Sequence, residues 1–471
     1  MKKTHLLLAF YILHFTLSAQ TISQKLQKAY QQFESDSQLR HAISSLYVIN
    51  AKTGEVLFDK NSQIGLSPAS TQKILTAAAA FDLLGKDYRY RTELGYDGKV
   101  ENGILEGNLC IVGYGDPTLG SWRYPATMDT IILNRWLGAV QKLKVKKIDG
   151  DIVAVDNKFE TQTTPGGWIW EDIGNYYGAG VSALNWHENQ YDMKLRPGHK
   201  EGDSVEIIST HPKLDYNYLV NELRTGPKGS GDNAYIYLPP YGYNGFVRGT
   251  VPLGEQSFII SGSFQLPSAY PVIFLANKLN ETGIKISDNE PKTSTAFAAY
   301  HKKMPLPDQI LDTHYSPSLD SIVYWFLQKS INLYGEALIK TLAYEKKGFG
   351  ATDTGIVILK DFWKQKGLDD HELNIYDGSG LSPLNRVTTH AQVEILKYAK
   401  ERPWFPFFIK ALPEYNKMKM KSGSISDVKG FCGYHTSGDG AQYIFSFLVN
   451  NYSGTSSEVV KKMYQVLDCL K

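Results

Sequence analysis

The sequence predicts a mixed α/β (α+β) fold in which a long insertion divides one domain into two chain segments. Strand-like runs occur near both ends of the chain, and helical runs lie between these strands and the insertion. Residues 89–295 differ in character, with many Gly, Asn, Asp and Tyr residues and short strand-like runs. We therefore expect one domain from residues 20–88 and 296–471, and β-rich inserted domains in residues 89–295, two in number with one nested in the other.

The first segment contains a predicted hairpin and a helix. Residues 45–49 and 55–58 have the composition of strands, and residues 50–54 join them as a turn. A helical run covers residues 71–84 and stops at Gly85, a residue type common just after a helix. Within the insertion, short strands are expected; two of them cover residues 104–112 and 258–260.

The second segment begins with helices. Residues 316–318 precede a helical run that ends at Gln328, and residues 333–343 form a second run. Asp353 is the expected cap of a third helix, which continues to Trp363.

The chain then returns to strands and closes with a helix. Residues 418–420, 431–436 and 443–449 are expected strands, and Gly438-Asp439-Gly440 is a turn between the last two. Ser456 is the expected cap of an amphipathic helix with apolar residues at helical spacing through Leu470.

The composition is that of a folded globular protein without a strong charge. The 471 residues are 42% hydrophobic and 21% charged, with 50 Lys+Arg against 48 Asp+Glu. A formal net charge of +2 gives no basic field, so a nucleic-acid partner is not expected.

The N-terminus has the pattern of a secretory signal peptide over residues 1–19. Lys2 and Lys3 precede the mostly apolar residues 6–17, and Leu17-Ser18-Ala19 resembles a cleavage site. A buried N-terminal helix is the alternative. The run is short for a membrane span and no later window is apolar enough, so no transmembrane anchor is expected.

Three cysteines, Cys110, Cys432 and Cys469, lie far apart in the sequence. Their spacing does not fit a zinc site, and no histidine pattern supplies a metal motif, so no metal is expected. One disulfide and three buried thiols both remain open.

Ser70-Thr71-Gln72-Lys73 places a serine and a lysine at the start of the first predicted helix. Positions i and i+3 share a helix face, so the lysine amine reaches the serine hydroxyl. A backbone N–H at a helix N-terminus is available to an oxyanion. Taken alone, the motif also fits a capping serine with a solvated lysine.

Two further motifs make the catalytic interpretation the better one. Ser330-Ile331-Asn332 lies between two helical runs, and Lys421-Ser422-Gly423-Ser424 lies on a strand. Each alone also fits ordinary structure, as a polar loop or as an edge-strand lysine. S-x-x-K, S-x-N and K-[ST]-G in this order are typical of serine β-lactamases and penicillin-binding proteins.

The sequence resembles the class C low-molecular-mass penicillin-binding proteins, the D-alanyl-D-alanine carboxypeptidase/endopeptidases of the bacterial periplasm, over nearly the whole mature chain. The resemblance implies a β-lactamase/transpeptidase-like catalytic domain, with inserted domains between the first two motifs. Ile331 and Ser422 depart from it, since Asp and Thr are commoner there. Further family-like segments are residues 113–119, 167–172, 175–179, 182–185, 332–338, 377–382 and 385–387.

The resemblance implies a role for each motif residue. Lys73 would take the proton from Ser70, which attacks the carbonyl between two D-alanines, and Ser330 would relay a proton to the leaving amine. Asn332 would hold a substrate amide. Lys421 and Ser422 would bind the terminal carboxylate, and the N–H groups of Ser70 and Ser424 would bind the oxyanion. The catalytic residues would thus be Ser70, Lys73, Ser330, Asn332 and Lys421. The substrate-binding residues would include Ser422, Gly423 and Ser424.

The resemblance also implies that Asp172 and Arg386 read the free end of the stem-peptide side chain, which carries an ammonium and a carboxylate. The alternative is a surface carboxylate and a structural arginine.

The expected function is therefore that of a periplasmic serine D,D-peptidase without a cofactor. Its partners would be peptidoglycan peptides, with β-lactams as covalent inhibitors; the sequence predicts no oligomeric state. A β-lactamase and a non-catalytic peptidoglycan-binding protein are the rival interpretations. Turnover of a chromogenic cephalosporin would favour the first rival, and failure to form an acyl adduct would favour the second.

Overall fold

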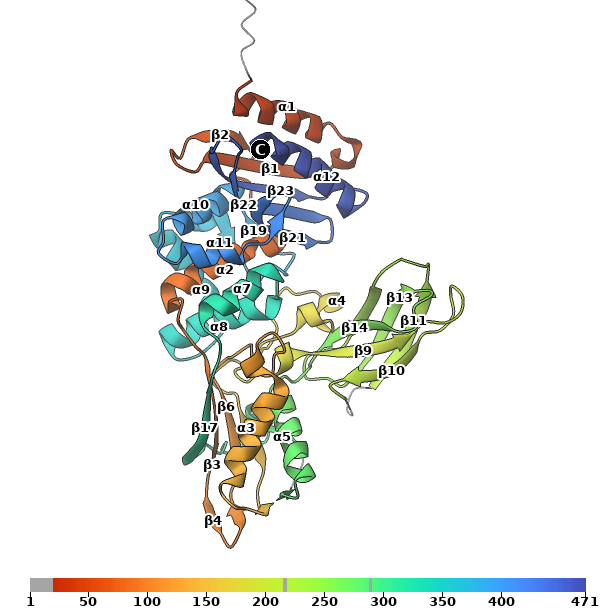
Figure 1. Cartoon of the computed structure of the whole chain (residues 1–471), viewed down its shortest axis with the longest axis vertical. Helices are drawn as coiled ribbons and strands as arrows, with labels where there is room; N and C mark the ends of the chain where they lie inside the picture. The colour runs from red at the N-terminus through yellow and green to blue at the C-terminus, as the bar shows by residue number, and fades with distance from the viewer. Residues whose placement is uncertain (1–19, 215–217, 288–289) are drawn as a thin grey trace, which may run out of the picture.

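The structure, a computed structural model, describes residues 20–214, 218–287 and 290–471. The expected signal peptide, residues 1–19, lies outside the described residues. The described chain forms three bodies: an upper one that contains the C-terminus, a lower one, and a strand-rich one beside the junction of the other two (Figure 1).

The upper body is built from both ends of the chain around one antiparallel sheet, which confirms the predicted α+β fold class. The sheet order is β2-β1-β23-β22-β21-β20, so an N-terminal strand lies directly beside a C-terminal one. The strands extend the expected ones by a few residues. Their bounds are Ile43–Asn50 (β1), Val56–Lys60 (β2), Glu414–Tyr415 (β20), Met418–Ile425 (β21), Val428–Thr436 (β22) and Gln442–Asn450 (β23).

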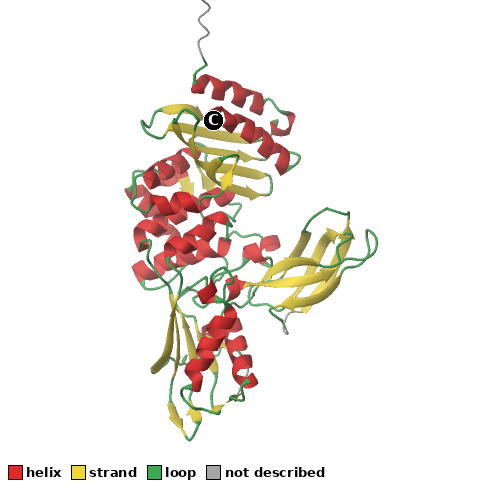
Figure 2. Cartoon of the chain, viewed as in Figure 1, coloured by secondary structure: helices red, strands yellow, loops and turns green. Residues whose placement is uncertain are grey.

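Helices cover both faces of this sheet (Figure 2). The two terminal helices, α1 (Ile22–Glu34) and α12 (Ser456–Leu467), pack together on one face, and their apolar residues form a core with the sheet. The other face carries α2 (Lys73–Leu84), α7 (Leu319–Gln328), α8 (Asn332–Lys347), α9 (Thr352–Gln365), α10 (Thr389–Lys400) and α11 (Phe405–Ala411).

The α2 helix is central to this second layer. Residues 73–81 are all buried, and the alanines Ala77 to Ala80 allow α7, α8, α9 and α10 to pack around it. A helix that is apolar all round belongs in the interior. Two caps differ from expectation: Thr455, and not Ser456, caps α12, and Ala351 precedes α9, whose first turn contains Asp353.

The chain leaves the upper body after Tyr90 and returns at Ser316, whose N–H donates to the Tyr90 carbonyl at 2.9 Å. The lower body contains a five-stranded sheet in the order β16-β8-β6-β3-β17, beside a small sheet of β4, β5, β7 and β15. Strand bounds are Arg91–Tyr96 (β3), Lys99–Glu101 (β4), Ile104–Glu106 (β5), Leu109–Gly113 (β6), Lys147–Ile148 (β7), Ile152–Val155 (β8), Lys285–Ile286 (β15), Lys292–Thr293 (β16) and Gln309–Tyr315 (β17).

Two features of the lower body differ from the sequence expectation. It contains the helices α3 (Asp129–Gln141) and α5 (Ala269–Glu281), which pack against each other, so this part of the insertion is mixed α/β rather than β-rich. Their helical spacing is visible in the sequence, since Ile132, Trp136 and Val140 recur every four residues. The expected end of the insertion at residue 295 falls inside this body, because β17 pairs with β3.

The third body is nested within the lower one, and its described residues form strands and no helix (Figure 2). It consists of two three-stranded sheets, β10-β9-β14 and β11-β13-β12. The strands are Gln190–Arg196 (β9), Glu206–His211 (β10), Tyr218–Gly226 (β11), Asn233–Tyr237 (β12), Asn244–Pro252 (β13) and Phe258–Ser263 (β14).

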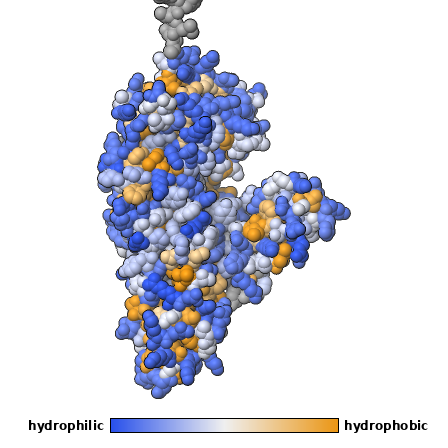
Figure 3. All heavy atoms as spheres, viewed as in Figure 1, coloured by the Kyte–Doolittle hydropathy of each residue, from blue (hydrophilic) through white to orange (hydrophobic). Residues whose placement is uncertain are grey.

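The visible face of the molecule is mainly hydrophilic, with apolar side chains in small groups (Figure 3). Among the described residues, no helix is long and apolar enough to cross a membrane.

Candidate active site

Ser70 lies in a tight turn, Ala69–Gln72, that leads directly into α2. Ala69 has a φ of 46°, a left-handed conformation that is costly for a residue with a side chain. Gly380 packs closely against this turn and holds it in place. The contact is so close that a Cβ on Gly380 would lie 2.0 Å from the Ala69 carbonyl oxygen. A strained, enclosed turn of this kind is typical of a functional position and holds Ser70 at the cavity wall.

Lys73 is completely buried one turn after Ser70. Its Nζ lies 2.9 Å from Ser70 Oγ, 2.6 Å from Asn332 Oδ1 and 2.7 Å from the Ser379 carbonyl oxygen. Burial lowers the pKa of Lys73 well below its usual range, and the nearby charge of Lys421 lowers it further. The amine is therefore biased toward its neutral form.

The turn between α7 and α8 supplies the second motif. Ser330 has a φ of 57°, and both Ser330 and Asn332 line the same cavity as Ser70. Asn332 begins α8 and links two bodies, since its Nδ2 donates to the Tyr177 carbonyl at 2.8 Å while its Oδ1 faces Lys73. The Lys73 amine hydrogen-bonds to Ser70, Asn332 and Ser379, and among the described residues no hydrogen bond joins it to Ser330.

The third motif lies within β21, which continues beyond the expected strand of residues 418–420 to Ile425. Lys421 is buried, and its Nζ donates to the carbonyl of Ser422 at 2.8 Å. Burial lowers the pKa of Lys421 to about 7. Ser422 is half-buried, whereas Ser424 is exposed and lines the cavity.

Gly423 allows β21 to approach the serine turn. A Cβ at this position would lie 2.6 Å from the Pro68 carbonyl oxygen, 2.8 Å from Thr71 N and 2.9 Å from Ser70 N. A side chain of any size would therefore push the strand away from Ser70.

The free edge of β21 presents a backbone donor to the cavity. Met420 N–H points away from β22, because it donates to the Pro413 carbonyl. N–H groups alternate along a strand, and β21 pairs with β22 in unbroken register. The Ser424 N–H therefore also points to the open edge, where a second donor besides the Ser70 N–H is available.

A buried loop, residues 377–382, supports Lys73 from the opposite side. Asp377 accepts hydrogen bonds from the N–H groups of Gly380 and Ser382 and from the indole of Trp168, which fixes the loop. Glu336 accepts from the Gly378 N–H at 2.9 Å. Burial and the neighbouring Asp377 raise the pKa of Glu336 to about 8.

Sequence reasoning gave no role to this support. The signal was present, because Asp377-Gly378-Ser379-Gly380 and Glu336 both lie in family-like segments. Only the folded chain shows that the Ser379 carbonyl, 306 residues from Lys73, is one of its three partners.

The cavity has a volume of about 480 Å³ and lies where the three bodies meet. Ser70, Ser330, Asn332 and Ser424 line one part of it. The same upper body also contributes Lys329, Ile331, Leu333, Gly380, Leu381, Pro383, Ile425 and Ser426. The insertion supplies the opposite part of the wall, with Arg123, Ile169, Glu171, Asp172, Tyr176, Tyr177, Glu188, Gln190 and Tyr235.

The two expected specificity residues have different positions. Asp172 lines the cavity, and burial together with Glu171 raises its pKa to about 6. Arg386 is exposed and is not among the residues that line the cavity; its guanidinium donates to the carbonyls of Pro383 and Asn385.

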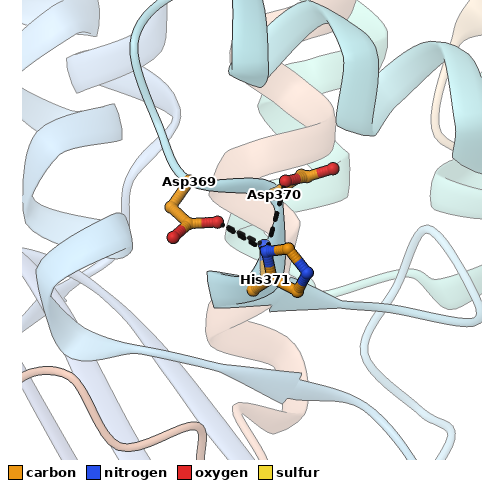
Figure 4. Close-up of side chains that lie close together, drawn as sticks. All are labelled: Asp369, Asp370 and His371. Carbon is orange, nitrogen blue, oxygen red and sulfur yellow. Dashed lines mark hydrogen bonds and ion pairs between the residues drawn. The ribbon is translucent and has the colours of Figure 1, made fainter.

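A separate cluster of potential metal ligands lies on the surface after α9 (Figure 4). Ligand atoms of Asp369, Asp370 and His371 lie within 4.8 Å of one another. Asp369 already accepts from the His371 N–H and ring nitrogen, each at 2.9 Å, so these contacts account for the cluster as a helix cap. The three cysteines are free thiols; Cys110 and Cys432 are buried.

The α+β fold and a serine paired with a buried lysine at the edge of the sheet define an active-site serine hydrolase. A model of the D-Ala-D-Ala carboxypeptidase 3 (S13) family matches residues 23–470, and the chain belongs to this family. The family recognised from the motifs, and with it the assignment as an enzyme, is confirmed.

Known proteins agree with this assignment. The chain is 28% identical to a D-alanyl-D-alanine carboxypeptidase of Actinomadura sp. (strain R39), over 90% of this chain and 81% of the relative. It is 24% identical to D-alanyl-D-alanine carboxypeptidase DacB of Haemophilus influenzae, over 86% of this chain and 84% of the relative. The crystal structure of penicillin binding protein 4 (dacB) from Haemophilus influenzae has a TM-score of 0.78 at 21% identity, covering 94% of this chain and 98% of that one.

Proposed function

We propose that this protein is a periplasmic serine D-alanyl-D-alanine carboxypeptidase/endopeptidase that acts on peptidoglycan peptides through an acyl-enzyme on Ser70. One observation carries the proposal: the three neighbours of Lys73 Nζ are two acceptors and one hydroxyl. A neutral amine has two N–H donors and one lone pair. In the structure Lys73 Nζ donates to all three partners. When Lys73 is neutral, its two N–H groups stay on Asn332 and Ser379, and its lone pair faces the Ser70 hydroxyl and accepts that proton.

In the proposed acylation, Lys73 takes the Ser70 proton as Oγ attacks the carbonyl between two D-alanines. The N–H groups of Ser70 and Ser424 hold the oxyanion; loss of one such donor typically costs about 3 kcal/mol. The C–N bond then breaks, and the proton that Lys73 took from Ser70 passes through Ser330, at the cavity wall, to the leaving amine, which restores neutral Lys73. Water attacks the ester, releases the acid and returns the proton to Ser70.

Substrate binding relies on the two remaining motifs. Lys421 donates to the protein through one N–H, so its other N–H groups, together with the Ser422 hydroxyl, are available for the terminal carboxylate. Asn332 Nδ2 has a second N–H beyond its bond to Tyr177, and this group serves a substrate amide. Asp172 serves the ammonium of the stem-peptide side chain from the wall of the cavity.

The relatives support this substrate class, because they are named as D-alanyl-D-alanine carboxypeptidases. Inhibition by penicillin is supported by a second structure of the Haemophilus influenzae protein, described as complexed with a β-lactam. The periplasmic location rests on the signal-peptide pattern of residues 1–19 and on the extracytoplasmic position of peptidoglycan.

The test is the intact mass of the mature protein after incubation with benzylpenicillin, beside a Ser70→Ala control. We expect a mass increase of one penicillin that is absent in the control. No adduct with the antibiotic unconsumed would refute the acyl-enzyme and favour a non-catalytic binding protein. No adduct with the antibiotic hydrolysed would favour a β-lactamase.

A further inference from the structure

Arg123 lies in the wall of the active-site cavity, although no motif in the sequence pointed to it. It comes from the insertion, just before the short helix Pro125–Thr127, and its side chain is 19% exposed. The guanidinium therefore stands at the same opening as Ser70.

Arg123 is held rigidly by a buried carboxylate. Its Nε donates to both oxygens of Glu188, at 2.8 and 3.1 Å. Glu188 is 2% exposed and also accepts from Ser121 Oγ at 2.7 Å and from the Tyr334 hydroxyl at 2.8 Å. Because each of these partners fixes the carboxylate, the direction of the guanidinium is set before any ligand arrives.

Two indole rings add to this positioning. The guanidinium carbon of Arg123 lies 5.3 Å from the centre of the Trp122 ring and 5.4 Å from that of Trp325, within the range of cation–π attraction. Trp325 belongs to α7, so the insertion and the catalytic body both contribute to the position of Arg123.

The terminal nitrogens of Arg123 have no hydrogen-bond partner among the residues that the structure describes. A guanidinium carries five N–H donors, and only the one on Nε is used here. Two parallel terminal N–H groups match the two oxygens of a carboxylate. The opposite charge lies in the same cavity, in Glu171 and Asp172, so the wall suits a ligand that carries both an anion and a cation.

We propose that Arg123 binds a carboxylate on the side chain of the substrate peptide, distinct from the terminal carboxylate beside Lys421. The proposal rests on the proposed peptidase function and assigns its specificity for acidic, amino-dicarboxylate-containing peptides. It places the cationic specificity group at Arg123 rather than at Arg386, because Arg386 does not line the cavity and its Nη1 donates to two backbone carbonyls.

The experiment compares two tripeptides that end in D-Ala-D-Ala and differ in one group. Their first residue is 2,6-diaminopimelate, with its distal carboxylate either free or converted to a carboxamide. The readout is the ratio of kcat/KM for the acid to kcat/KM for the amide, measured for the parent, Arg123→Gln, Arg123→Lys and Arg386→Gln. Arg135→Gln is the matched control, because Arg135 also ion-pairs in the insertion, with Asp312, but does not line the cavity.

We expect a ratio of at least about tenfold in the parent, as for a charge-assisted hydrogen-bonded pair. The ratio should fall to near unity in Arg123→Gln. It should fall only in part in Arg123→Lys, because lysine keeps the charge but lacks the planar pair of N–H donors. It should stay at the parental value in Arg386→Gln and Arg135→Gln. If Arg123→Gln does not fold, Arg123→Lys decides the matter.

A parent that cleaves acid and amide equally well would overturn the role of Arg123 and leave the peptidase function intact. A ratio that collapses in Arg386→Gln but persists in Arg123→Gln would overturn it in favour of Arg386. A parent that cleaves neither peptide and forms no penicillin adduct would instead refute the proposed function.

Discussion

Replacing Gly423 by alanine is expected to disable the site without touching any functional group. The added Cβ would lie 2.6, 2.8 and 2.9 Å from Pro68 O, Thr71 N and Ser70 N. These are backbone atoms, which cannot rotate away as the end of a side chain does. Ordinary contact begins near about 3.4 Å, so β21 and the serine turn must separate by on the order of half an ångström or more.

This separation acts on catalysis more than on stability. Overpacking of this kind typically costs about 1–3 kcal/mol, which is less than the ~5–15 kcal/mol by which folded proteins are typically stable. The Ser424 N–H, however, moves away from Ser70, and a misplacement near 1 Å can cost about a hundredfold in rate. We expect acylation by benzylpenicillin to slow by about tenfold to a hundredfold.

The assay is the rate of penicillin adduct formation followed by intact mass, with thermal unfolding measured on the same samples. Gly438→Ala is the matched control, because it lies in the turn after β22 and a Cβ there meets nothing within 4 Å. Parental acylation rates in Gly423→Ala would refute the argument that close approach of β21 completes the site.

Two further predictions concern titration. In the proposed role, Lys421 binds the terminal carboxylate as an ammonium; burial lowers its pKa to about 7, so kcat/KM for peptides should fall as pH rises through this value. Lys421→Arg keeps the positive charge and should move this fall in kcat/KM to higher pH. A fall at the same pH as in the parent would contradict the assignment. Burial and the neighbouring Asp377 raise the pKa of Glu336 to about 8. Between its ordinary pKa and this value, the Glu336 carboxyl is protonated in the folded protein and ionised in the unfolded chain. The stabilisation from its raised pKa is complete below its ordinary value and is lost as pH rises through about 8. Glu336→Gln should therefore flatten the loss of unfolding free energy between about pH 5 and about pH 9, measured by urea denaturation, and parallel curves would refute this.

The contact within the first motif could be predicted because it depends on local geometry. Ser70 and Lys73 are one helical turn apart, so their contact follows from the sequence spacing once a helix starts there. Strand patterns predicted the sheet, since β1 and β21 to β23 alternate or are continuously apolar in the chain itself.

The insertion shows where local patterns did not suffice. Residues 104–112 were expected as one strand, but the chain turns at Gly107, and β5 and β6 join different sheets. The return strand β17 has no strong pattern of its own, and only its pairing with β3 assigns it to the lower body. Pairing partners distant in sequence decide such elements.

The sequence by itself determined the fold class, the family and the order of the three motifs, because these rest on periodicity and on short motifs of fixed spacing. The tertiary structure alone decided what surrounds them: the Ser379 carbonyl on Lys73, the absence of Arg386 from the cavity and the presence of Arg123 in it. These contacts join segments hundreds of residues apart, and their geometry depends on how three bodies pack, which no local spacing encodes.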